Sequence, residues 1–462
     1  MTKIVCVGAG SFSFGLSTLI TLLQSNDLNS SEICLVDHNQ ESLDLISQLA
    51  EWLNLEWDCH KQISSHTNHK DALKGANFVI NSTEVTPREE LWEADCKITD
   101  KYGLRQPYGE NGGPGGFAHA ARNVVPVLGI ARDIETFAPE AWLINFTNPM
   151  HRLCYLVNQY TNVKVVGLCH QLGMGYAMAA KAFAERYRFD GAEEFLSTHA
   201  DPRNHQASHH FQALGQNAFK IKAAGLNHFT WMLNLQDRTS GEDLYPAFRE
   251  AWEKVDAGFE PLTRKVFNHF GLFPIPGDEH LCEYLPWMSN PLTNPWKKYD
   301  CSLYDWDLNA ALRDFQWDMI KTTMATKQSA ESFKYPDSEG ALEVITGLLN
   351  DRPLYWESVN IPNAGLIAGL SPESIVEVPA ILSSGSIHGE IIGEMPKAIT
   401  GLLQRETLCS QLCIDAVVRG DRQLAIQSLL LDPVINDLDI AEMVLVDILE
   451  ANKAYLPQFW EQ

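Results

Sequence analysis

The sequence predicts an α/β protein in which short apolar strands alternate with helices, so that its N-terminal part forms a largely parallel sheet. Short apolar runs occur at residues 3–7, 33–36, 78–81, 142–146 and 163–168. Longer stretches with helical periodicity, such as residues 16–23 and 124–137, lie between them. This alternation is typical of βαβ units, whose strands pair in parallel.

A glycine-rich turn joins the first apolar run to the first helical stretch. Gly8 allows a tight turn and Gly10 allows the backbone to approach a pyrophosphate, while the helix that follows offers free N–H groups and the positive end of its dipole. With Ser11 and Phe12, these glycines are the residues that we expect to bind the pyrophosphate of a dinucleotide. The third glycine of the usual pattern is replaced by Ser13, so the turn needs support from the strands around it.

Asp37 provides part of that support, because it directly follows the second apolar run. A carboxylate at the end of the second strand binds the ribose hydroxyls of the adenosine, which favours NAD over NADP. We therefore interpret residues 1–190 as a Rossmann-type NAD-binding domain.

The pattern changes after about residue 190. Residues 191–215 are polar and rich in histidine without clear periodicity, and we interpret them as a solvated loop rather than a metal site. Helical segments at 310–333, 342–349 and 441–454 then alternate with strand-like pieces at 219–223 and 374–378. Residues 191–462 are therefore predicted to form a second, helix-rich α/β domain for substrate, metal and oligomer contacts.

Composition excludes several classes of function. Of the 462 residues 45% are hydrophobic, and the formal net charge is −24, without a run of Lys or Arg that could neutralise a phosphate backbone. Nucleic acid and anionic membranes are therefore poor partners. The ten cysteines are spread widely, and we interpret Cys409 and Cys413 as idle buried thiols. The N-terminus begins directly with a strand pattern, and no stretch of eighteen apolar residues follows, so we expect a cytoplasmic protein.

Polar residues are concentrated in stretches that follow predicted strands or turns. Residues 145–149 and 167–170 each end a strand of the first domain, where ligands of parallel sheets bind. Residues 225–231 open the second domain, and residues 278–284 follow a turn rich in proline and glycine.

These stretches resemble the family-4 glycoside hydrolases, NAD- and divalent-metal-dependent glycosidases related in fold to lactate and malate dehydrogenases. The resemblance runs the length of the chain. It is carried by the Gly-Ala-Gly-Ser start, Gly113-Pro114-Gly115-Gly116, Thr147-Asn148-Pro149, Gly167-Leu168-Cys169-His170, Gly225-Leu226-Asn227-His228, residues 360–365 and residues 376–380.

The resemblance implies a redox mechanism that differs from two-carboxylate glycoside hydrolysis. Bound NAD⁺ would take hydride from C3 of the sugar, a base would remove the acidified C2 proton, and the glycosidic oxygen would leave C1 by elimination. Water would then add and NADH would return the hydride. A divalent metal, Mn²⁺ in much of the family, would bind the C2 and C3 oxygens as a Lewis acid.

The resemblance also assigns residues. Cys169 and His228 match the family's two protein ligands to the metal, and Asn148 matches an asparagine that holds sugar hydroxyls near the nicotinamide. His170 would contact the substrate. Without the resemblance, each of these residues has a structural explanation. Cys169 would be a buried thiol, His228 a hydrogen-bonded histidine, and Asn148 a turn residue before a proline.

The catalytic base has three candidates in one stretch: Asp278, His280 and Tyr284. We favour Asp278, because a carboxylate beside metal-bound substrate stays ionised. The alternative interpretation is that Asp278 caps a helix.

The substrate class depends on the residue after Cys169. In the family, His170 is typical of members that act on unphosphorylated sugars, and the Gly-Asp-x-His-Leu pattern at 277–281 looks like the α-galacturonidase and α-glucuronidase branch. We therefore favour a hexuronide, with a neutral α-glucoside or α-galactoside as the alternative. The partner of a uronate carboxylate stays open among Arg105, His119 and Arg122.

Two other classes of function fit the sequence less well. An NAD-dependent 2-hydroxy acid dehydrogenase would need a His/Asp relay and an Arg clamp but no Cys/His metal pair, and a non-catalytic NAD-binding regulator is opposed by the complete set of site motifs. The resemblance further implies a homodimer or homotetramer, with residues 341–349 as a candidate interface.

Overall fold

The structure of the chain is a computed structural model that describes residues 1–11, 15–106, 108–192, 195, 205–290, 292–301, 304–327, 329–334 and 340–460, apart from the side chains at 205–207 and 332. Phe12, which the sequence places at the cofactor, lies outside the described residues.

The first half of the chain forms a parallel sheet. Its strands are β1 (Lys3–Val7), β2 (Glu32–Val36), β3 (Gln62–His66), β4 (Phe78–Asn81), β5 (Trp142–Asn145) and β6 (Lys164–Gly167). They lie in the order β3-β2-β1-β4-β5-β6, which is the strand order of a dinucleotide-binding fold. The predicted fold class is confirmed.

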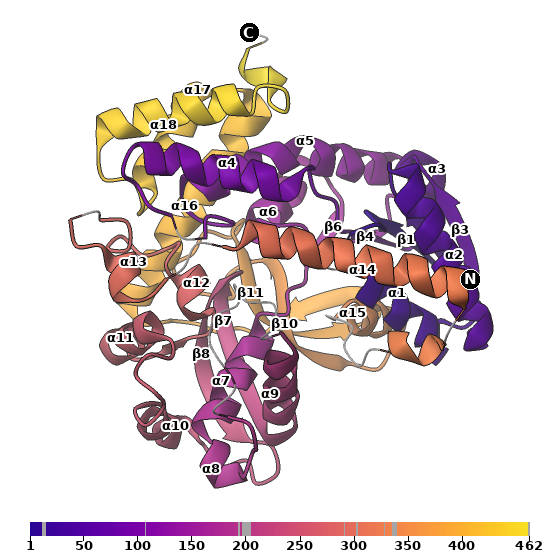
Figure 1. The fold of residues 1–462 in the computed structure, drawn as a ribbon, viewed down its shortest axis with the longest axis horizontal. Coiled ribbons are helices and arrows are strands. Elements are labelled where there is room, and N and C mark those ends of the chain that lie inside the picture. Colours follow the sequence, from indigo (N-terminus) through magenta and orange to yellow (C-terminus); the bar gives the residue numbers. More distant parts are fainter. Residues whose placement is uncertain are drawn as a thin grey trace.

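Helices cover both faces of this sheet. They are α1 (Gly15–Gln24), α2 (Gln40–Glu56), α3 (His69–Leu73), α4 (Arg88–Lys101), α5 (Gly113–Phe137) and α6 (Met150–Tyr160). Alternate residues of a strand face opposite sides, so Ile4 packs with α1 and α2, whereas Val5 and Val7 pack with α3 and α5. Figure 1 shows α5 along one side of the sheet and α1 along the other.

The second half of the chain extends the same sheet. It contributes β7 (Phe219–Leu226), β8 (Phe229–Asp237), β9 (Phe273–Pro274), β10 (Leu354–Pro362), β11 (Ile375–Ser383) and β12 (Ser386–Gly389). β10 pairs antiparallel with β6, and the order continues β10-β11-β7-β8-β9. The sheet thus crosses the boundary proposed at residue 190, and the division into two domains stays a prediction.

Most of the remaining helices surround this extension and the outer side of α5, whereas α14 (Trp306–Thr326) runs from α4 to α2 beside the parallel strands (Figure 1). The others are α7 (Leu172–Ala182), α8 (Ala184–Tyr187), α9 (His205–Ala218), α10 (Tyr245–Trp252), α11 (Pro261–Phe270), α12 (Gly277–Leu281), α13 (Pro295–Lys298), α15 (Ala341–Leu349), α16 (Lys397–Arg419), α17 (Arg422–Leu431) and α18 (Leu438–Ala451). In the described part of the chain, no helix combines the length and apolarity that crossing a bilayer requires.

Three predictions for the second half need correction. The segment interpreted as a loop over residues 191–215 includes helix α9, whose Phe211 is buried and stacks on Phe195 at 5.3 Å between ring centroids. Tertiary packing thus overrides weak helical periodicity. The helix predicted at 310–333 ends earlier, because Lys327 adopts a left-handed conformation after α14.

The third correction concerns α15, which the sequence offered as an oligomer interface. Its apolar residues Ala341, Val344 and Ile345 are fully buried within the chain. They belong to the core that also contains Leu16 and Leu19 of α1, so this apolar face is not available to a second subunit.

Candidate active site

The candidate site lies where the parallel strands end. Gly8 follows β1, Asp37 follows β2, Glu84 follows β4, Asn148 follows β5 and Cys169 follows β6. Parallel strands end at one edge of a sheet, so their following loops can surround one ligand.

The glycine turn after β1 has the geometry that a dinucleotide requires. Gly8 has a positive φ of 83°, and a Cβ there would lie 2.6 Å from a backbone oxygen after β4. A Cβ on Gly15, the first residue of α1, would lie 2.6 Å from a carbonyl oxygen of the turn. Gly15 therefore allows the close packing of the helix on the turn, which is the role of the third glycine in the usual pattern, here replaced by Ser13.

Asp37 connects the turn to β2. Its Oδ2 accepts a hydrogen bond from the Gly10 amide at 2.9 Å, and its Oδ1 accepts one from the Asn39 amide at 2.9 Å. The Ser11 amide donates to the Gly8 carbonyl at 2.9 Å. Asp37 thus holds the glycine turn at the place where a ribose hydroxyl would compete for its oxygens, as in an NAD site.

Cys169 and His228 meet although they come from opposite halves of the chain. Cys169 lies two residues beyond β6, whereas His228 occupies the turn between β7 and β8 with a left-handed φ of 59°. The Cys169 Sγ lies 3.2 Å from His228 Nε2. β10 and β11 bring the two together, since they continue the sheet from β6 to β7.

This pair fits a shared divalent metal. The Cys169 thiolate and the His228 imidazole would together hold the ion, since their donor atoms lie 3.2 Å apart at one place. The other ring nitrogen, His228 Nδ1, lies 2.7 Å from the Asn111 side-chain amide. A second group that orients the ring is usual for metal-ligating histidines.

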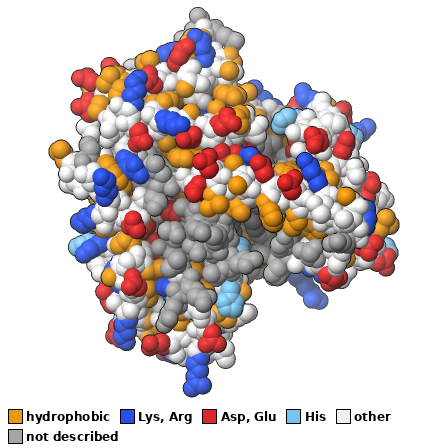
Figure 2. Space-filling view, viewed as in Figure 1, with side chains coloured by type: hydrophobic (Ala, Val, Ile, Leu, Met, Phe, Trp, Pro, Cys, Tyr) orange, Lys and Arg blue, Asp and Glu red, His pale blue; other side chains and the backbone are white. Residues whose placement is uncertain are grey.

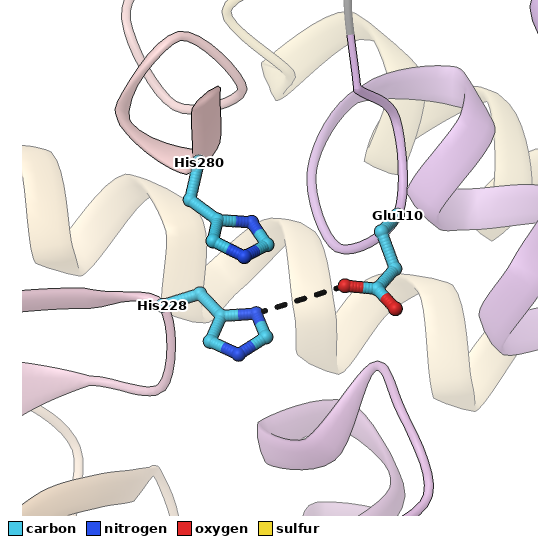
Figure 3. Close-up of side chains that lie close together, drawn as sticks. All are labelled: Glu110, His228 and His280. Carbon is cyan, nitrogen blue, oxygen red and sulfur yellow. Dashed lines mark ion pairs between the residues drawn. The ribbon is translucent and has the colours of Figure 1, made fainter. Parts of the chain in front are cut away.

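Two further side chains with metal-ligating atoms lie next to His228. Its ring stacks on His280 at 4.0 Å between centroids, and its Nδ1 lies 3.9 Å from Glu110 Oε2. Figure 3 shows both rings side by side with the Glu110 carboxylate beside them. A ligand atom of each of these three residues lies within 4.8 Å of the others. Asn148 joins the group, because its amide donates to Glu110 Oε1 at 3.3 Å.

Arg88 and His119 partly neutralise the acidic side of the site. Arg88 lies 2.8 Å from Glu110 Oε1 and 3.6 Å from Glu84 Oε2, so two carboxylates share one guanidinium. His119 Nε2 also lies 2.9 Å from Glu84. Burial opposes ionisation of Glu84, but His119 and Arg88 outweigh it and lower its pKa to about 2. Glu84 is therefore a fixed negative charge at neutral pH.

His280 has the environment of a general base. Its Nδ1 lies 2.8 Å from Glu283 Oε1, and the other oxygen of Glu283 accepts the amides of Asn111 and Gly112 at 2.8 and 3.0 Å. Burial lowers the pKa of His280, but the hydrogen bond and charge of Glu283 outweigh it, so that its pKa is raised. A carboxylate that holds one nitrogen orients the ring and increases the basicity of the other nitrogen.

Asp278 has different contacts from those expected of the base. Its Oδ2 accepts the Leu262 amide at 2.8 Å and its Oδ1 accepts the Thr263 amide at 2.6 Å, in the first turn of α11. Burial raises its pKa, and the Asp278 amide donates to Glu260. The structure thus gives Asp278 a capping role, although for α11 rather than for the helix that begins beside it.

Tyr284 and His170 also differ from simple site residues. Tyr284 is buried against Phe229 at 4.6 Å between rings, and burial holds its pKa well above the usual value, which disfavours it as a base. His170 is exposed beyond β6. Its charge would lower the pKa of Glu377, although burial is the larger influence and raises it.

Two of the three cations considered for a uronate carboxylate already contact a carboxylate, whereas the Arg105 Nε has no hydrogen-bond partner among the described residues. Arg122 lies 2.7 Å from Asp95 and is buried, and the Arg105 guanidinium lies 5.9 Å from the Trp296 ring centre. His119 contacts Glu84, as described above.

Sequence reasoning missed Glu84, Arg88, Glu110, Asn111 and Glu283. Glu84 had a usable signal, because it follows a buried strand at the ligand-binding edge. Glu283 stands in the same stretch as the three candidate bases. Glu110 and Asn111 lie in a loop before α5, where the pattern alone indicates a helix start rather than a site.

Comparison with known proteins identifies the family. The family 4 glycosyl hydrolase profile matches residues 3–183, and that of its C-terminal domain matches residues 223–435. An α-glucosidase of Erwinia rhapontici is 31% identical, with 94% of each chain covered, and an α-galacturonidase of Lachnoclostridium phytofermentans is 28% identical, with 99% of this chain and 97% of the relative covered. A 6-phospho-α-glucosidase from gut microorganisms, solved with NAD and Mn²⁺, superposes with a TM-score of 0.78 at 19% identity over 99% of each chain. The chain belongs to the family 4 glycosyl hydrolases.

Proposed function

We propose that this enzyme hydrolyses α-glycosides of unphosphorylated, neutral hexoses with the help of NAD and a divalent metal. The observation that carries the proposal is the 3.2 Å contact between Cys169 and His228 at the sheet edge that also holds the glycine turn. A dehydrogenase of hydroxy acids has no use for this thiolate–imidazole pair.

The residues divide into a cofactor group and a metal group. Gly8, Gly10, Ser11 and Asp37 would hold the dinucleotide, whereas Cys169 and His228 would hold the metal, as the NAD and Mn²⁺ of the 6-phospho-α-glucosidase structure support. When bound, NAD⁺ supplies a hydride acceptor for C3 and the metal supplies a Lewis acid for the C2 and C3 oxygens.

His280 is the group that we assign to the C2 proton, in place of Asp278. Its ring contacts His228, and Glu283 holds its Nδ1, so Nε2 can accept a proton. Both oxygens of Asp278 are occupied by backbone amides of α11. Asn148 and Glu110 would hold sugar hydroxyls, since they follow β5 and precede α5 at the same edge.

The charge of the site favours a neutral sugar over the hexuronide suggested by the sequence. Glu84 and Glu110 share Arg88, and Glu283 adds another carboxylate behind His280. A uronate or a 6-phosphate would bring its charge toward these carboxylates, which costs free energy unless a cation offsets it. The relatives include both an α-glucosidase and an α-galacturonidase, so the charge of the site carries this choice.

A cytoplasmic homodimer or homotetramer is part of the proposal. All ten cysteines are free thiols in the structure, which suits a reducing compartment. Light scattering should give a mass that is a multiple of the single-chain 51.8 kDa, and a mass equal to it would contradict self-association.

The decisive test is a panel of 4-nitrophenyl glycosides with purified protein. The α-glucoside and α-galactoside, the α-galacturonide and the 6-phosphate of the α-glucoside are each assayed with NAD⁺, Mn²⁺ and a reductant. We expect cleavage of a neutral α-glycoside that EDTA abolishes, that Mn²⁺ restores and that leaves no net NADH. Cleavage of the uronide alone would show that the substrate is a hexuronide, as the sequence suggested. Net reduction of NAD⁺ without cleavage would indicate a dehydrogenase. Full activity of protein free of both cofactors would overturn the mechanism.

A further inference from the structure

We propose that Tyr304 and Trp306, at the start of α14, form the subsite for the leaving group, and that it binds a neutral sugar ring. The inference rests on the proposed glycosidase function and adds the part of the substrate that lies beyond the cleaved bond. It therefore predicts a disaccharide or longer oligosaccharide rather than a glycoside of a small alcohol.

A series of aromatic contacts leads from the candidate base to this position. The Tyr108 ring meets the His280 ring edge-on at 4.6 Å and the Tyr304 ring at 5.3 Å. Trp92 stacks on Tyr304 at 4.5 Å and contacts Tyr108 at 5.3 Å. Tyr304 is thus separated from His280 by a single ring, that of Tyr108.

Tyr304 is also within electrostatic reach of the site. Burial raises its pKa to about 12, and the charges of Arg88 and Glu110 act on it in opposite directions. Arg88 in turn lies over the Trp92 ring at 4.9 Å. The aromatic rings and the acidic site are therefore packed close to one another.

A pocket lies at Tyr304 and Trp306. It has a volume of about 260 Å³ and is lined by Glu93, Tyr304, Asp305, Trp306 and Asp307. Trp306 is half-buried, and its indole N–H is buried without a hydrogen-bond partner among the described residues. An aromatic ring beside polar groups suits a pyranose, which presents an apolar face and a rim of hydroxyls.

The charge of the lining selects among leaving groups. The polar members are Glu93, Asp305 and Asp307, and Asp305 also accepts the Leu308 amide at 2.9 Å as the cap of α14. Carboxylates accept hydrogen bonds from sugar hydroxyls but repel a phosphate or a uronate. Figure 2 shows acidic side chains over the part of the surface where α4 and α14 run in Figure 1. A neutral sugar is therefore the occupant that fits.

The test compares a disaccharide with a methyl glycoside in wild type and Trp306→Ala. With the neutral sugar that the glycoside panel identifies, loss of one stacking side chain should raise KM for its α-linked disaccharide about 10-fold and leave kcat/KM for its methyl α-glycoside within about 2-fold. Trp306→Tyr keeps an aromatic ring and should retain most of the affinity. This variant distinguishes loss of stacking from a folding defect. Trp287→Ala removes an exposed tryptophan that packs on Phe270 and should change neither substrate.

Tryptophan fluorescence gives a readout that needs no turnover. The disaccharide should quench wild-type fluorescence more than the methyl glycoside does, and Trp306→Ala should lose that difference. If Trp306→Ala lowers the affinity for both substrates equally, or for neither, the proposed subsite is refuted but the glycosidase function is not. If no glycoside is cleaved but the Trp306-dependent quench remains, the proposed reaction fails and the binding site survives. Absence of both turnover and quench overturns both.

Discussion

Two clusters in this protein place three metal-ligating side chains within 4.8 Å, yet their surroundings differ. Glu110, His228 and His280 form one at the edge of the sheet, and Glu406 and Cys409 of α16 form the other with Asp432 at the end of α17. The members of the second cluster are all buried, whereas His280 of the first is partly exposed.

The second cluster already has its counter-charge in Arg152, whereas burial lowers the pKa of His151 and makes it a neutral partner. Glu406 Oε1 lies 3.1 Å from Arg152 and 3.4 Å from His151, and both partners are buried in α6. The charges of Arg152 and Arg405 also act on Asp432. A cation that entered here would face two guanidinium groups, so the cluster serves to join α6 to the C-terminal helices.

The first cluster has an excess of acid and an open approach. Glu84 and Glu110 share Arg88, and Cys169 adds a partly exposed thiol 3.2 Å from His228. Short distances between donor atoms therefore do not by themselves define a metal site. Charge balance and access decide, and they favour the sheet edge.

The largest expected effect comes from removing the metal ligands. His228→Ala and Cys169→Ser should each lose bound Mn²⁺ and reduce kcat/KM by at least about 10³-fold, because a two-ligand site cannot hold the ion with one donor. The measurements are elemental analysis after dialysis and the glycoside assay.

Cys409→Ser is the matched control from the second cluster. It should keep the Mn²⁺ content and the activity of wild type, since Arg152 and His151 already satisfy that cluster. Loss of Mn²⁺ from Cys409→Ser but not from Cys169→Ser would mean that the second cluster, rather than the first, holds the metal.

The next effect separates His280 from Asp278. His280→Gln should slow elimination about 10²- to 10⁴-fold, the range of general base catalysis, while hydride exchange with bound sugar continues. In D₂O, wild-type product should carry deuterium at C2, and His280→Gln should lose labelling and cleavage together. Asp278→Asn should keep labelling in those molecules that remain folded. The reverse outcome would return the role to Asp278.

The dinucleotide fold was predictable because its signals are local. Gly8, Gly10 and Asp37 stand at strand ends that short apolar runs define, and each has a backbone reason for its identity. The Cys169–His228 contact came only through the family resemblance, since 59 residues separate the two and the antiparallel strands that join them gave no strong pattern.

The choice of Asp278 shows where sequence reasoning stops. Asp278 is chemically suitable as a base and lies two residues from His280. Its carboxylate instead accepts hydrogen bonds from two backbone amides at the start of α11. That contact depends on the packing of α11 against α12, which no local pattern encodes. The aromatic series through Tyr108 was missed for the same reason, because its members come from separate loops.

A third prediction addresses the structural role of the second cluster. Arg152→Met leaves Glu406 as a buried carboxylate without its guanidinium, and the free energy of unfolding should fall by about 3–5 kcal/mol. Denaturant unfolding measures this loss, and Mn²⁺ content of the remaining folded protein should stay at the wild-type level. An unchanged stability would mean that Glu406 finds another partner or accepts a proton.

The smallest expected effect is the pH dependence that this cluster imposes on stability. Burial, followed by the charge of Glu406, raises the pKa of Asp432 from 3.8 to about 7. Between these values the folded protein holds a proton that the unfolded chain releases, so stability falls as pH rises, by about 2–3 kcal/mol from pH 5 to pH 7. Asp432→Asn preserves the acceptor for the Val434 amide at 2.9 Å and cannot ionise. The variant should therefore match wild type only below pH 3.8, where Asp432 is protonated in both states, and should unfold at a higher temperature than wild type near pH 8. Equal melting temperatures at pH 8 would show that Asp432 is ionised in the folded protein, with the arginines of the cluster compensating for its burial.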